Sequence, residues 1–87
     1  MPISGSNQII NVALNYKWFE EKTVNTNGNT INLNSVVPVG GRLRIVDKKY
    51  GQEWFEGQNW NRNGQTITLI SNLPETLTFQ IWCFSID

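Results

Sequence analysis

The sequence predicts an all-β domain, a small antiparallel sandwich or barrel built from two repeats of about 36 residues. Three observations predict this class. Apolar and polar residues alternate with the two-residue period of a half-buried strand. Asn-Gly, Pro and Gly-Gly turn signals separate the alternating segments at short intervals. Residues 18–38 (WFEEKTVNTNGNTINLNSVVP) match residues 54–74 (WFEGQNWNRNGQTITLISNLP) at eleven of twenty-one positions, which indicates one unit used twice and stacked.

The chain is expected to form a single domain. Residues 1–7 are small and polar and are predicted to be a flexible lead-in. Residues 8–87 form the predicted all-β domain, which divides into internal repeats 8–43 and 44–87. No segment places apolar residues at helical spacing between caps, so no helix is predicted.

Six strands follow from the alternation, in order along the chain. The first strand should place Tyr16 and Trp18 on the same face. Asn27-Gly28 and Asn63-Gly64 are typical of hairpin turns before a return strand. Strands are predicted over residues 8–18, 29–34, 42–47, 52–55, 65–70 and 76–86, and residues 59–63 are predicted to be a loop.

The length, composition and charge of the chain exclude several classes of function. The 87 residues contain one cysteine, Cys83, and no histidine, so a disulfide within the chain is impossible and a zinc site is not expected. Small chains without disulfides or structural metals are marginally stable, and this favours a homo-oligomer. Seven basic and seven acidic side chains balance without runs of one sign. This pattern argues against nucleic-acid binding, and no apolar stretch is long enough to predict membrane insertion or a cleaved leader.

Catalysis, metals and cofactors are not predicted. Without histidine no base stands beside a serine or cysteine nucleophile, and Cys83 lies in an apolar strand typical of an inert core. Glu20 and Glu56 occupy equivalent positions in the two repeats. A carboxylate pair is the minimum for glycoside hydrolysis, but the repeat should place these two in separate surroundings, as solvated strand-end charges.

Aromatic side chains are the better candidates for a binding surface. Trp18 and Trp54 are in phase with the preceding strand and are predicted to lie in the core. Phe19, Phe55 and Trp60 fall on the other face, where a ligand or partner could meet them. The last strand is apolar on both faces, which predicts burial on both sides or a subunit contact. The predicted interface residues are Val36, Val37, Phe79, Ile81, Trp82 and Phe84.

One pattern of turn and strand residues occurs twice in the chain. Asn-Gly-x-Thr-Ile-x-Leu-x-Ser, then a Pro or Gly-Gly bend and alternating apolar residues, spans residues 27–45 and returns more loosely over residues 63–81. This pattern resembles the small β-sandwich repeats in fibre, tail and capsid-decoration proteins of tailed bacteriophages. The resemblance implies a non-enzymatic structural protein located in the virion. It also implies a homo-oligomer, with a trimer favoured, that attaches to virion proteins or a host surface.

A second pattern lies in residues 43–60 of the chain. Residues 43–46 (LRIV) followed by residues 52–60 (QEWFEGQNW) are similar to a blade of the fucose-binding lectins that assemble six-bladed propellers from three two-repeat chains. This resemblance implies a cytoplasmic or released oligomer that binds a host-surface glycan. The first repeat would hold a degraded site, because Gln8, Lys17 and Val24 stand at the corresponding positions. The implied sugar-binding residues are Arg44, Glu53, Trp54 and Trp60.

Overall fold

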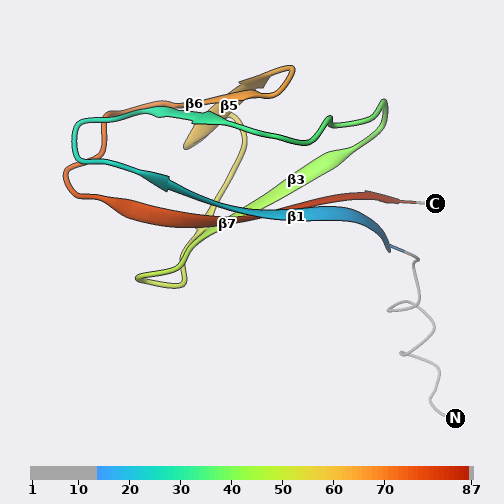
Figure 1. The fold of residues 1–87 in the computed structure, drawn as a ribbon, viewed down its shortest axis with the longest axis horizontal. Helices are drawn as coiled ribbons and strands as arrows, with labels where there is room; N and C mark the ends of the chain where they lie inside the picture. The colour runs from blue at the N-terminus through green and yellow to red at the C-terminus, as the bar shows by residue number, and fades with distance from the viewer. Residues whose placement is uncertain (1–13, 87) are drawn as a thin grey trace, which may run out of the picture.

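The computed structural model describes residues 14–86, which form two antiparallel sheets and no helix (Figure 1). The predicted all-β class is confirmed, and the two sheets form a small sandwich. One sheet has the strand order β1-β7-β3-β4 and the other β2-β6-β5. The strands are β1 (Leu14–Val24), β2 (Thr30–Asn32), β3 (Arg42–Asp47), β4 (Glu53–Trp54), β5 (Trp60–Asn63), β6 (Thr66–Leu69) and β7 (Leu77–Ile86).

The two repeats are interleaved rather than stacked, and an approximate twofold axis relates them. Adding 36 to a residue number in the first repeat gives its counterpart in the second. At the centre of the four-stranded sheet, Ile45 of β3 pairs with its own counterpart, Ile81 of β7. In the three-stranded sheet, Ile31 of β2 likewise pairs with its counterpart, Ile67 of β6. Both central pairs therefore lie on the axis. The predicted boundary between the repeats, after residue 43, falls within β3, and β3 as a whole is the counterpart of β7.

The repeats diverge after their shared Trp-Phe-Glu segment. In the first repeat the chain continues along β7 as far as Val24. In the second, β4 pairs only with Ile45 and Val46 before the chain crosses to the other sheet as β5. Residues 60–63 are therefore a strand, and the prediction of a loop there is wrong. The segment has a single apolar residue, so it lacks the alternation by which a strand is recognised.

The two Asn-Gly turns also differ. Asn63 pairs with Thr66, so the second turn closes the predicted hairpin between β5 and β6, with Gly64 at a φ of 64°. The first turn instead joins β1 to β2 in the opposite sheet, and here Asn27 itself takes the positive φ of 68°. The prediction of a hairpin at the first turn is wrong, because β1 remains paired with β7.

A bulge in β1 decides which side chains reach the core. The β1–β7 register shifts between Tyr16 and Trp18, so these residues point to opposite faces of the sheet. The prediction that they share a face is therefore wrong. The flexible lead-in predicted for residues 1–7, and the part of the first predicted strand before residue 14, lie outside the described residues.

The core lies between the two sheets and is apolar except for one carboxylate. Asp47 is buried, and it accepts hydrogen bonds from the Tyr50 amide (2.5 Å) and the Trp54 indole (3.0 Å). Trp18 and Trp54 pack against the core, as predicted. The buried apolar residues are Val24, Ile31, Leu33, Ile45, Trp60, Ile67, Leu69, Leu73, Leu77, Phe79, Ile81 and Cys83.

Candidate functional site

Four aromatic side chains gather on the outer surface of the four-stranded sheet, and we call this surface the aromatic face. It consists of Tyr16 and Phe19 from β1 and Trp82 and Phe84 from β7. Tyr16 and Phe84 meet in a tilted contact with ring centroids 6.1 Å apart, and Phe19 and Trp82 do the same at 5.2 Å. Tyr16 remains 59% exposed and Phe19 49% exposed. A cluster of large aromatic rings that is accessible to solvent is typical of a binding surface.

Charged side chains beside the rings neutralise one another. The Arg44 guanidinium lies 5.8 Å from the centre of the Trp82 ring and 3.4 Å from the Glu53 carboxylate. Across the sheet, Lys48 lies 3.4 Å from the Glu21 carboxylate. Because each pair joins a base to an acid, these four side chains add no net charge to the aromatic face.

The residues of the predicted sugar site are divided between two surfaces. Arg44 and Glu53 lie together on the outer surface. Trp54 is half-buried and packs edge-on against Phe79, with ring centroids 5.0 Å apart. Trp60 is 1% exposed, and its indole N–H donates to the Trp54 carbonyl at 2.7 Å. The expectation that Trp60 faces a ligand or partner is therefore wrong, because β5 turns its ring inward to fill the core.

The predicted interface residues are also divided. Trp82 and Phe84 belong to the aromatic face, and Val36 is exposed in the β2–β3 loop. Val37 packs against the core. Phe79 and Ile81 have no exposed surface, so the expectation that they meet a partner is wrong. Their side chains point to the inner face of β7, since neighbouring residues of a strand alternate between faces.

The sequence did not single out Tyr16. It predicted Phe19 on a ligand or partner face and Trp82 and Phe84 as interface residues, but not that these rings gather on one surface. Tyr16 and Phe19 become part of the aromatic face because β1 pairs with β7 along its length. The local signal for Tyr16 was its alternation with Trp18, which the bulge interrupts.

Glu20 and Glu56 have different surroundings despite their equivalent positions. The Glu20 carboxylate accepts hydrogen bonds from the amides of Asn34 (3.0 Å) and Ser35 (2.7 Å), and the Lys22 ammonium lies 3.7 Å away. Partial burial acts to raise the pKa of Glu20, but these hydrogen bonds and Lys22 outweigh it and lower the pKa. Glu20 therefore fastens the β2–β3 loop to β1, which corrects the expectation of a solvated charge. Glu56 is exposed in the loop between β4 and β5.

The remaining reactive group is buried. Cys83 lies within the core, and burial raises the pKa of its thiol. Over residues 14–86, no three Cys, Asp or Glu side chains come close enough to hold a metal ion. The same residues include no helix of the length and hydropathy that a membrane span needs. Comparisons of the chain with protein-family models, curated proteins and solved structures find no match.

Proposed function

We propose that this chain is a non-enzymatic virion structural protein, a capsid-decoration, fibre or tail module, that self-associates through the aromatic face. The observation that carries the proposal is the set of four aromatic rings on one open sheet surface. Burying such rings stabilises a complex by about 25 cal/mol per Å² of apolar surface removed from water. The attachment to virion proteins rests on the sequence resemblance to phage modules.

A second copy of the chain suits this surface because two of its basic side chains are already paired with acids. The Arg44–Glu53 and Lys48–Glu21 pairs are each balanced, so these four groups add no like-charge repulsion when two identical faces meet. Aromatic and arginine side chains are enriched at the centres of protein interfaces. Association would also supply apolar burial that a chain of 87 residues lacks by itself.

Repeat symmetry provides a matched test of self-association. Phe19 and Phe55 hold equivalent positions and are 49% and 51% exposed, but only Phe19 belongs to the aromatic face. Light scattering should give the wild-type chain a mass that is a multiple of 10.0 kDa. Phe19→Ser should reduce that mass to one chain, while Phe55→Ser should not, with circular dichroism confirming that both variants fold. A monomeric wild type, or equal effects of the two substitutions, would refute the self-association.

The virion assignment needs a separate experiment. Virus particles purified by density gradient from cultures that make the chain should contain it at a fixed ratio to the major capsid protein, measured by peptide mass spectrometry. Recovery of the chain only in the particle-free fractions would refute this assignment.

A glycan-binding role is the second candidate, and the neighbouring Arg44, Glu53 and Trp82 side chains favour it. These groups combine an aromatic ring with hydrogen-bonding charges on one surface. A glycan array tests this role with Trp82→Ala, which removes the half-buried ring beside Arg44. Trp60→Ala is unsuitable as the test variant, since it would open a cavity in the core.

A further inference from the structure

The two Asn-Gly pairs of the chain, Asn27-Gly28 and Asn63-Gly64, can react with themselves. The main-chain nitrogen of the glycine bonds to the side-chain carbonyl carbon of the asparagine. The carboxamide nitrogen takes up the proton of the attacking N–H and leaves as ammonia. Water then opens the five-membered succinimide to aspartate or isoaspartate. Glycine favours this ring closure, because it has no side chain to shield its nitrogen.

Ring closure requires the peptide unit between the two residues to rotate toward the asparagine side chain. Hydrogen bonds to this peptide unit, or to the units beside it, hold the main chain in place. Each bond that must open makes the reactive conformation rarer. Two pairs that are equivalent in the sequence can therefore differ in reactivity if the fold holds them differently.

The first turn is held by three main-chain hydrogen bonds. The Gly28 N–H donates to the Asn25 carbonyl at 2.8 Å, so the attacking nitrogen is already engaged. The Asn27 N–H donates to the Leu73 carbonyl at 2.8 Å, and the Leu73 N–H donates to the Gly28 carbonyl at 2.9 Å. A Cβ at Gly28 would lie 2.9 Å from both the Asn25 carbonyl oxygen and a Val24 methyl carbon, so the turn is also crowded.

The second turn is open. Asn63 and Gly64 are both exposed, and a Cβ at Gly64 would meet no atom within 4 Å. Among the described residues, no main-chain carbonyl accepts a hydrogen bond from the Gly64 N–H, so the attacking nitrogen is free. The Gly64 carbonyl accepts one bond, at 2.8 Å, from the exposed side of the Arg62 guanidinium. The pairing of Asn63 with Thr66 is the last of the β5–β6 ladder, where strands open most readily.

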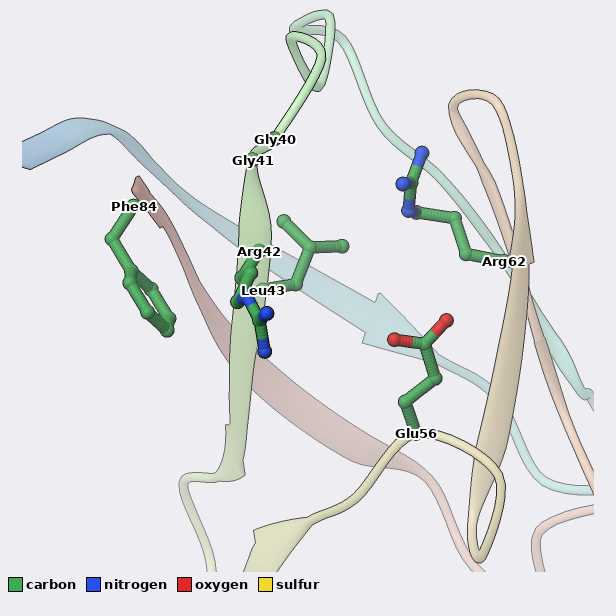
Figure 2. Close-up of a pocket in the computed structure, with 7 residues that line it drawn as sticks. All are labelled: Gly40, Gly41, Arg42, Leu43, Glu56, Arg62 and Phe84. Atoms are coloured by element: carbon green, nitrogen blue, oxygen red, sulfur yellow. The ribbon is translucent and has the colours of Figure 1, made fainter. Parts of the chain in front are cut away.

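A hollow beside this hairpin leaves it without a neighbour on one side. The hollow has a volume of about 500 Å³ and opens between the start of β3 and the β4–β5 loop (Figure 2). It exists because β4 pairs only with Ile45 and Val46, so no strand lies beside the earlier part of β3 on that edge. Figure 2 shows Arg62 on β5 with its side chain directed into this space. β5 is also the outer strand of its sheet, so only β6 supports the turn.

We propose that Asn63 deamidates spontaneously in the folded chain, whereas the fold protects Asn27. Each event replaces a neutral carboxamide by a carboxylate. Because seven basic and seven acidic side chains balance, the net charge of the chain changes from 0 to −1. The isoaspartate product also lengthens the main chain by one carbon at the end of the β5–β6 hairpin. Neither turn belongs to the aromatic face, so the proposal does not depend on self-association or on a place in a virion.

Incubation of the folded chain at pH 8, followed by peptide mass spectrometry, tests the proposal. The rate at which each Asn-Gly peptide gains the mass of a carboxylate is compared with its rate in guanidinium chloride, where neither turn is formed. Asn63 should react in the folded chain within severalfold of its unfolded rate. Asn27 should react at least about tenfold more slowly than when unfolded, because three hydrogen bonds hold its turn.

Two variants assign the reaction to one site. In isoelectric focusing, an acidic form of the wild-type chain should accumulate with time. Asn63→Gln should prevent its formation at the wild-type rate, because glutamine would have to close a larger and less favourable ring. Asn27→Gln is the matched control and should leave the rate unchanged. Equal slowing of both sites by folding, or an acidic form that appears in Asn63→Gln at the wild-type rate, would overturn the proposal without bearing on the oligomeric state.

Discussion

Replacement of Glu20 by glutamine tests the view that this carboxylate fastens the β2–β3 loop to β1. Glu20 accepts two amide hydrogen bonds, and its side chain is only 10% exposed. A hydrogen bond to a charged group contributes about 1.5–3 kcal/mol, and the amide oxygen of glutamine retains part of it. We expect Glu20→Gln to lower the free energy of unfolding by about 2 kcal/mol at pH 7. In a domain of this size the melting temperature should fall by about 10 °C.

The same substitution makes a prediction for the pH dependence. The pKa of Glu20 is lower in the folded chain than its ordinary value of 4.5. Its contribution to stability is therefore present above pH 4.5 and is lost as the pH falls through the lowered folded pKa. The difference between wild type and Glu20→Gln should accordingly shrink in acid.

Urea unfolding at pH 7 and at a pH well below 4.5 measures both effects. Glu56→Gln is the matched control, because it changes the equivalent glutamate at an exposed position and should alter stability little. Equal losses for the two variants at pH 7, or a Glu20→Gln loss that persists unchanged in acid, would refute the reasoning.

Three further predictions concern the core. Trp60→Ala should lower the free energy of unfolding by about 3–5 kcal/mol in urea titrations, and a loss below 1 kcal/mol would contradict the burial of its ring. Asp47→Ala should lower the free energy of unfolding by about 3 kcal/mol in the same assay, because it leaves the Trp54 indole and the Tyr50 amide without a hydrogen-bond acceptor. Asp47→Asn should lower it less, because one acceptor oxygen remains. Cys83 should react with a disulfide reagent at pH 8 only after urea is added, because burial limits access and raises its pKa; rapid labelling of the folded chain would contradict this.

The sequence predicted most clearly the segments with one buried face. Apolar residues alternate in β3 and β6, and in β7 one face is apolar from Leu77 to Cys83; these strands lie close to their predicted bounds. β5 was missed because Trp60 is its single apolar residue. The repeat itself held a signal for Trp60, which aligns with Val24, and both side chains fill the core.

The aromatic face and the hollow could not be predicted from local patterns. The aromatic face depends on the pairing of β1 with β7, whose partners lie far apart in the chain. The bulge between Tyr16 and Trp18 has no sequence signature and moves Tyr16 to the outer surface. The hollow depends on where β4 stops pairing. The two identical Trp-Phe-Glu segments behave differently there, so this segment does not by itself decide the outcome.

The interleaving of the repeats has a consequence for how the chain folds. β3–β4 and β5–β6 can pair soon after they are made, but the closest partners in the β1–β7 ladder, Val24 and Leu77, are separated by 53 positions. Pairing across such distances slows folding toward the millisecond-to-second range. On the ribosome, β1 has no strand to pair with until β7 has been synthesised. Neither repeat is therefore an independent folding unit, and the chain should fold in a single late step.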